Sequence, residues 1–217
     1  MNKHALSKTA VQRTAARLRA TALALTVALT VPAVSMAQTM DPDEMTLDEN
    51  LSYPKVPDKA RNSIVRHIER IGNTFKSKGI EVKYTRSGEV ADIVVPCSEL
   101  FDPNSTELSV RAPRYLNALQ ALVKLPTLYK IVVVVHADDT GSAEYSDALT
   151  EERSDTIDEY LRTLAPDAKV NVIPYGMGQD EPRAANNSIA GRAANRRVEF
   201  YIVPESQTID MAASGKL

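Results

Sequence analysis

The sequence "YKIVVVVHADDTGSAEYSDALTEER", residues 129–153, decides the fold. It opens with an unbroken run of mostly β-branched residues, which is typical of a strand covered on both faces. A polar loop follows, and Thr150 is in position to cap a helix that we expect from Glu151 to Leu164. A buried strand followed by a helix predicts an α/β arrangement.

Two charged residues of this stretch stand where such folds bind ligands. Asp138 follows the strand, and Arg153 falls in the first turn of the expected helix. In α/β folds, ligands bind beside the carboxyl ends of strands. A cation in a first turn opposes the helix dipole by up to about 1 kcal/mol, so Arg153 is tolerated there rather than favoured.

Hydrophobic periodicity predicts further elements on both sides of this stretch. An amphipathic helix should run from Asp58 to Lys78, before Gly79, and another should start at Pro113 and end before Pro126. The expected strands are 80–85, 90–96, 169–176 and 196–203, and a short helix is expected at 188–194. Together they predict a two-layer α/β (α+β) sandwich with a mixed β-sheet.

The first 37 residues read as a secretory signal. Basic residues precede the apolar run "ATALALTVALTVPAV" without any acidic residue, and the small Ser35 and Ala37 fit a cleavage after Ala37. The alternative is an uncleaved anchor, although residues 21–37 are at the short limit for a membrane span and include Pro32. Cleavage predicts a protein of the periplasm, associated with the cell wall or the outer membrane.

Removal of this segment leaves an acidic protein. It holds five of the 26 Lys and Arg residues and none of the 28 acidic residues, so the remainder carries about −7. Nucleic acid is therefore disfavoured as a partner, because phosphate binding needs a surplus of cations.

Length and composition predict one main domain with additions at its ends. We expect an acidic, flexible tether at 38–57, a helix and hairpin strand at 58–90, an α/β domain at 91–204 and a tail at 205–217. No room remains for a transmembrane barrel, which needs about eight strands or more.

Few residues could hold a metal or carry covalent chemistry. Cys97 is the only cysteine, so no intramolecular disulfide can form. His67 and His136 are the only histidines after the first 37 residues, too few for a transition-metal cluster. We therefore expect neither a metal nor a cofactor.

The charges at Asp138 and Arg153 have two plain structural interpretations. They could form a surface ion pair worth about 0 to 1 kcal/mol, or Arg153 could pair with Glu151 or Glu152 alone. From composition and spacing these interpretations are favoured over a binding role.

Three ordered segments nevertheless carry a resemblance to a known family. They are "LFDPNSTEL", "VVVVHADDTGSAEYSDALTEERSDTIDEYL" and "GMGQDEPRAANNSIAGRAANRRVEFYIV". Between about Asp92 and Val203 the chain resembles the OmpA-like C-terminal domain. The resemblance implies helices packed on a mixed sheet and non-covalent binding of peptidoglycan, without cleavage.

The resemblance also implies a ligand site. In that family an aspartate and an arginine grip the diaminopimelate of the stem peptide, and they fall on Asp138 and Arg153. The chemistry agrees, because Asp138 can take the ammonium of an amino-acid head and Arg153 can fork onto its carboxylate. The predicted ligand-binding residues are Asp138, Arg153, Ser146, Thr150 and Arg196. We expect Asp138 and Arg153 to be largely solvated in the free protein.

The chain departs from the family pattern at two positions. Val135 stands where glycine is usual, and Ser146 stands where asparagine is usual, which puts one hydrogen bond to the ligand in doubt. Asn195, Arg196 and Arg197 match an "NRR" element, but the sequence does not say which arginine faces the ligand. Arg192 also matches, and it is interpreted as bracing a loop.

Two other classes of function remain open. An enzyme would need His136 and Asp138 with Ser142 or Ser146, an order that fits no arrangement of a nucleophilic serine. A structural, secretion or motility subunit would dock an envelope protein, for which the helix from Asp58 to Lys78 is the candidate surface.

Overall fold

The computed structural model describes residues 44–217, in which five strands form a mixed sheet. The strands are β1 Glu81–Thr85, β2 Val90–Pro96, β3 Tyr129–Val135, β4 Val172–Gly176 and β5 Arg197–Pro204. Their order in the sheet is β1-β2-β5-β3-β4. Strands β3 and β4 are parallel, and the other neighbours are antiparallel. The prediction of a mixed sheet in an α/β sandwich is confirmed.

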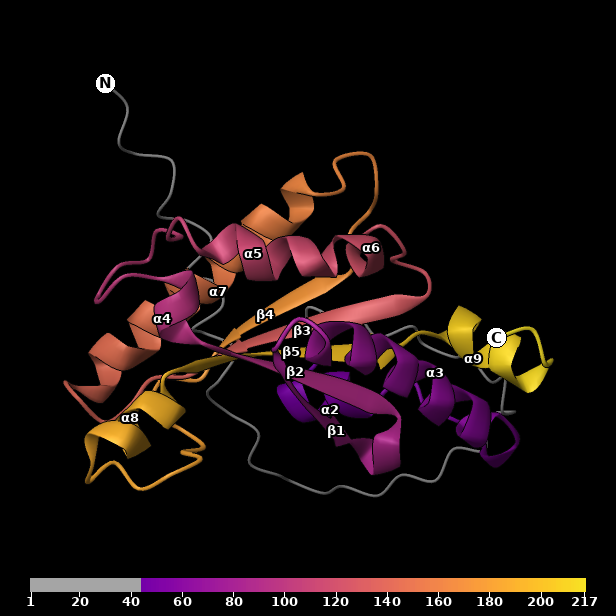
Figure 1. Ribbon diagram of the computed structural model, residues 1–217, viewed down its shortest axis with the longest axis horizontal. Helices are drawn as coiled ribbons and strands as arrows, with labels where there is room; N and C mark the ends of the chain where they lie inside the picture. Colours follow the sequence, from indigo (N-terminus) through magenta and orange to yellow (C-terminus); the bar gives the residue numbers. More distant parts are fainter. Residues whose placement is uncertain (1–43) are drawn as a thin grey trace, which may run out of the picture. The chain divides into compact units, whose positions relative to one another are not determined.

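Most helices lie on one face of this sheet or at its ends (Figure 1). They are α3 Asp58–Lys76, α4 Cys97–Leu100, α5 Ala112–Leu116, α6 Gln120–Val123, α7 Ala143–Thr163, α8 Ile189–Asn195 and α9 Ser206–Ala213. Two 3-10 turns, η3 Arg86–Gly88 and η4 Asn117–Leu119, complete the connections. The helix predicted from Pro113 is therefore a series of three short helical pieces.

Strand β3 is buried along its whole length, as its sequence predicts. Ile131, Val133 and Val135 belong to the main core under the helices. Val132 and Val134 belong to a smaller apolar cluster with Val90 and Val203. Since side chains alternate along a strand, this second cluster lies on the opposite face of the sheet.

Part of residues 44–57, which we call the strap, covers the opposite face, whereas Val56 at its end belongs to the main core. The strap contains α2 (Leu47–Ser52), whose N-cap Thr46 forms a capping box with Glu49. Leu47 and Leu51 pack on the second apolar cluster. The prediction of a flexible tether is wrong for this segment, and residues 38–43 lie outside the described residues.

Polar contacts fix the strap to the sheet. The buried Lys130 of β3 donates hydrogen bonds to Asn50 Oδ1 and to the carbonyl of Tyr53, each at 3.0 Å. Arg86 donates to two further strap carbonyls, those of Leu51 at 3.1 Å and Pro54 at 2.8 Å. The sequence did not reveal this packing because two leucines and a set of polar bonds leave no periodic apolar face.

Helix α7 begins at Ala143, well before the predicted start at Glu151. Its N-cap is Ser142, and Thr150 is a buried residue inside the helix. The predicted cap was wrong because the first turns of α7 bury small polar side chains rather than apolar ones. Gly176 of β4 allows this close approach, since a Cβ there would lie 2.4 Å from the Glu151 nitrogen.

Helices α3 and α9 both pack into the main core. Helix α3 buries Ile64, Ile68 and Phe75, and it packs on α9, where Ile209 and Ala212 are buried. Within residues 44–217 no helix is long and apolar enough to cross a membrane. The predicted signal segment lies outside the described part of the chain.

Candidate functional site

The candidate site lies at the carboxyl end of β3, where four segments meet. These are the loop 136–142, the first half of α7, the loop 101–111 and the end of α8, which Figure 1 shows at the same end of the sheet. Hydrogen bonds from Arg153 join α7 to the loop 101–111, and an ion pair joins Arg196 to Asp138. The tertiary structure thus brings together residues that lie up to 58 positions apart in the sequence.

Asp138 is buried, with 5% of its surface exposed, and its carboxylate already has two partners. Oδ1 accepts a hydrogen bond from the Thr140 nitrogen at 3.0 Å, and Oδ2 accepts one from Arg196 Nη1. Burial alone would raise the pKa of Asp138, but the bonds from Thr140 and Arg196 outweigh it and lower the pKa. Asp138 is therefore a carboxylate at neutral pH.

Arg153 is also buried, with 6% of its surface exposed. Its Nε donates to the carbonyl of Ser105 at 2.8 Å, Nη2 donates to the carbonyl of Asp102 at 3.3 Å, and its guanidinium lies 4.8 Å from the centre of the Phe101 ring. Burial lowers the pKa of Arg153, and the neighbouring Cys97 and Tyr145 oppose that change. The carbonyl bonds use two of the five guanidinium N–H groups.

Asp138 and Arg153 form no ion pair with each other. Within residues 44–217 no carboxylate lies in salt-bridge contact with Arg153, which also rules out the pairing with Glu151 or Glu152. Both plain structural interpretations are therefore wrong for the described chain. The expectation that the two residues are solvated is wrong as well, because both are buried.

The three residues of the "NRR" element, Asn195, Arg196 and Arg197, have different contacts. Arg196 reaches Asp138, and its side chain is 45% exposed. Arg197 is buried and donates to Glu199 Oε1 at 2.7 Å, which makes it a structural ion partner. Asn195 holds the preceding loop through the backbone nitrogens of Arg183 and Ala184. Arg196 is thus the arginine of this element that faces the site.

Ser146 and Thr150 are held in internal hydrogen bonds. Ser146 is buried, and its hydroxyl accepts from Gln179 Nε2 at 3.0 Å. The Thr150 hydroxyl donates to the Ser146 carbonyl at 2.9 Å and accepts from the Gly178 nitrogen at 2.9 Å. These bonds fasten α7 to the loop after β4. Ligand binding by Ser146 and Thr150 stays a prediction.

The side chains considered for an enzyme do not form a nucleophilic arrangement. His136 is fully buried, and its ring nitrogens contact Glu199 Oε2 and the Asp180 carbonyl. Ser142 caps α7, where its Oγ accepts from the Tyr145 nitrogen at 3.2 Å. The predicted loop-bracing role of Arg192 matches its bond to the Asn186 carbonyl at 2.8 Å.

Sequence reasoning missed the groups that hold Arg153. They are the Phe101 ring and the carbonyls of Asp102 and Ser105, all within the segment "LFDPNSTEL". The motif itself could have pointed to them, but backbone carbonyls have no signature in sequence. Burial raises the pKa of the adjacent Cys97 thiol to about 11, so Cys97 remains a neutral thiol.

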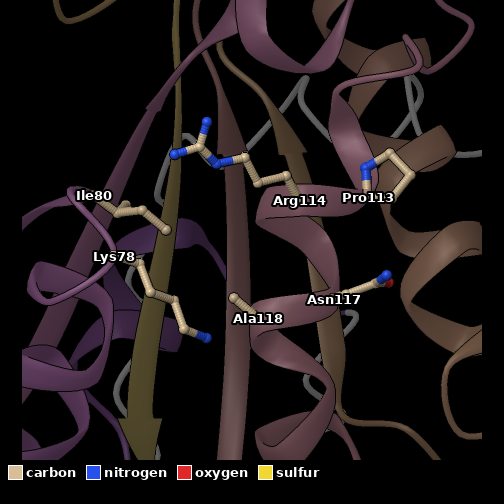
Figure 2. Close-up of a pocket in the computed structure, with 6 residues that line it drawn as sticks. All are labelled: Lys78, Ile80, Pro113, Arg114, Asn117 and Ala118. Atoms are coloured by element: carbon tan, nitrogen blue, oxygen red, sulfur yellow. The ribbon is translucent and has the colours of Figure 1, made fainter.

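A separate hollow of about 630 Å³ lies between the end of α3 and α5. Figure 2 shows its lining residues, which are Lys78, Ile80, Pro113, Arg114, Asn117 and Ala118. None of the predicted site residues is among them. The charged site at the end of β3 is therefore distinct from this hollow.

Comparison with known proteins agrees with this geometry. A sequence model of the OmpA family matches residues 100–196. This segment contains Asp138, helix α7 and the loop 101–111, whose carbonyls bind Arg153. Residues 100–196 are an OmpA-family domain. The matched segment begins after β2, so the strap, α3 and the hairpin precede it in the sequence.

Two curated relatives show the extent of the similarity. The chain is 30% identical over 129 residues to YiaD of Escherichia coli, named a probable lipoprotein, which covers 59% of this chain and 58% of YiaD. It is 35% identical over 96 residues to the peptidoglycan-associated lipoprotein of Legionella pneumophila, covering 42% of this chain and 53% of that protein. The chain thus spans little more than half the length of these relatives.

Solved structures show the same fold. A MotB-like protein from Desulfovibrio vulgaris has a TM-score of 0.58 at 24% identity, covering 67% of this chain and 96% of that one. The cell wall anchor of the type VI secretion system from Pseudomonas aeruginosa has a TM-score of 0.53 at 22% identity, with coverages of 64% and 97%. Identities this low establish the fold alone.

Proposed function

We propose that this protein binds peptidoglycan non-covalently, without cleaving it, and that the site at the end of β3 holds the free amino-acid head of diaminopimelate. The observation that carries the proposal is a buried guanidinium, Arg153, without a carboxylate partner in the described chain. An isolated buried cation is costly, and an anionic ligand would offset that cost. A relative named for its association with peptidoglycan supports the choice of ligand.

The charges around the site fit a zwitterion. Asp138 is ionised and keeps unused lone pairs on both oxygens, so it can accept a ligand ammonium beside Thr140 and Arg196. Arg153 retains donors on its terminal nitrogens, which can fork onto the carboxylate of the same carbon. The half-exposed Arg196 can turn from Asp138 toward that carboxylate. The proposed complex thus pairs each ligand charge with an opposite one.

The envelope location follows as part of the proposal. A signal cleaved after Ala37 would deliver the domain to the periplasm, where the wall is accessible. The alternative role in docking an envelope protein receives less support, because the apolar stripe of α3 is used by the core. A partner would meet only the polar face of that helix.

Co-sedimentation with purified sacculi tests the proposal. Asp138→Asn keeps the shape of the side chain but removes its charge, and it should weaken binding by about 2 to 5 kcal/mol, or roughly thirtyfold and upward. The exposed neighbour Asp139→Asn is the matched control and should bind like wild type. Sacculi with lysine in place of diaminopimelate should bind weakly, since they lack the carboxylate. Unchanged sedimentation of Asp138→Asn would refute the site.

A further inference from the structure

An apolar strip on α7 leads away from Arg153. Tyr145, Leu149 and Arg153 follow one another at intervals of four residues, so they share one face of the helix. Arginine side chains on a helix point back toward its N-terminus, which brings the guanidinium toward the other two residues. The strip therefore starts at the charged site.

Tyr145 is an aromatic residue that the fold leaves uncovered. It is one of the large hydrophobic residues that the fold leaves exposed, with 47% of its surface accessible. A Cβ on Gly141 would lie 3.6 Å from Cδ1 of the ring, which places the ring beside the loop that carries Asp138. Leu149, one turn further along, is half-buried.

We infer that Tyr145 and Leu149 form a subsite for the aliphatic spacer of the ligand, the trimethylene chain that joins the two amino-acid heads of diaminopimelate. This inference rests on the proposed function, because it requires one head to be held by Asp138 and Arg153. From that anchored head the spacer must run outward toward the rest of the stem peptide. The methylene groups of the spacer can be buried against an apolar strip beside the guanidinium, which removes them from water.

The subsite explains how the site can select its ligand. Every free amino acid carries the same zwitterionic head, so the charged residues alone would bind glycine as well as diaminopimelate. Contact of the methylene groups with Tyr145 and Leu149 favours the longer molecule by roughly five- to tenfold, the range expected for partial burial of such a chain. The strip therefore acts as a specificity determinant.

Titrations with diaminopimelate and with glycine, followed by NMR chemical shifts, test the subsite. Tyr145→Ala should weaken diaminopimelate binding roughly fivefold and leave glycine binding unchanged. Tyr145→Phe should behave like wild type, because the ring face makes the contact. Tyr53→Ala is the matched control, since Tyr53 is 54% exposed and belongs to the strap.

The results distinguish a failure of the subsite from a failure of the charged head-group site. If Tyr145→Ala binds diaminopimelate like wild type, or loses affinity for both molecules equally, the subsite is refuted while the charged site stands. If wild type binds neither molecule, the head-group site is refuted and the subsite falls with it. Leu149→Ala should reproduce the selective loss, and thermal melting of each variant will show that it is folded.

Discussion

Replacing Asp92 by asparagine should stabilise the protein at neutral pH. Asp92 lies on β2 with 4% of its surface exposed, and its buried Oδ1 has no hydrogen-bond partner in residues 44–217. Burial raises its pKa from 3.8 to about 8, and the nearby Glu199 adds to the rise, while Arg197 opposes it. The folded protein therefore holds this carboxyl protonated at pH 7.

The pKa shift sets the size and sign of the effect. A raised pKa contributes stability that is fully present below the unfolded value and is lost as pH rises through the folded value, here from about pH 4 to pH 8. Between pH 3.8, the ordinary pKa of the carboxyl, and pH 7, the free energy of unfolding falls by at most about 4 kcal/mol. Asparagine has the shape of the protonated acid and takes up no proton. We expect Asp92→Asn to raise the free energy of unfolding by about 2 to 4 kcal/mol at pH 7.

Urea denaturation followed by circular dichroism measures this difference. The gain of Asp92→Asn over wild type should be smallest near pH 4 and should grow steadily toward pH 8. Asp210→Asn, an exposed position on α9, is the control and should show no such trend. If the difference between Asp92→Asn and wild type stays constant across this range, Asp92 is not protonated in the fold and the reasoning fails.

Three further substitutions probe other parts of the structure. Arg153→Lys cannot keep both carbonyl bonds and the ring contact, so thermal melting should show a loss of about 1 to 3 kcal/mol, together with weaker sedimentation with sacculi. Asn195→Ala removes the four hydrogen bonds by which Asn195 holds the preceding loop, and it should lower the free energy of unfolding by about 2 to 4 kcal/mol in urea denaturation. A loss below about 1 kcal/mol would contradict this role of Asn195. Lys130→Met removes the ammonium that donates hydrogen bonds to Asn50 and Tyr53 of the strap. Limited proteolysis should therefore cut the strap faster than in wild type. An unchanged cutting rate would show that the apolar contacts alone hold the strap in place.

The family motifs indicated charged residues that the structure places close together, whereas local patterns did not indicate the partners of those residues. Asp138, Arg153 and Arg196 were singled out from the sequence, and the structure places all three at the end of β3. Their partners were not predictable, because the carbonyls of Asp102 and Ser105 reach Arg153 only through the folding of a distant loop. A hydrogen bond to backbone carries no residue-type signal, whereas a charged side chain does.

The sequence by itself determined which segments become strands and where the charged residues follow them. Strand β3 is an example, since its β-branched run cannot leave the core without exposing apolar surface on both faces. Tertiary structure alone decided that Thr150 is internal rather than a cap, because small polar residues on α7 fit against Gly176 and Gly178 of a segment far along the chain.

Tertiary structure also decided the state of the two central charges. The spacing in sequence allowed an ion pair between Asp138 and Arg153. In the folded chain Asp138 instead pairs with Arg196, and the Arg153 guanidinium lies over the Phe101 ring without a carboxylate partner in the described residues. The same holds for the strap, whose few leucines show no pattern until Val132 and Val134 lie beneath them. The physical reason is common to these cases: local patterns report the surface that a segment must bury, whereas only the folded chain fixes which partner covers it.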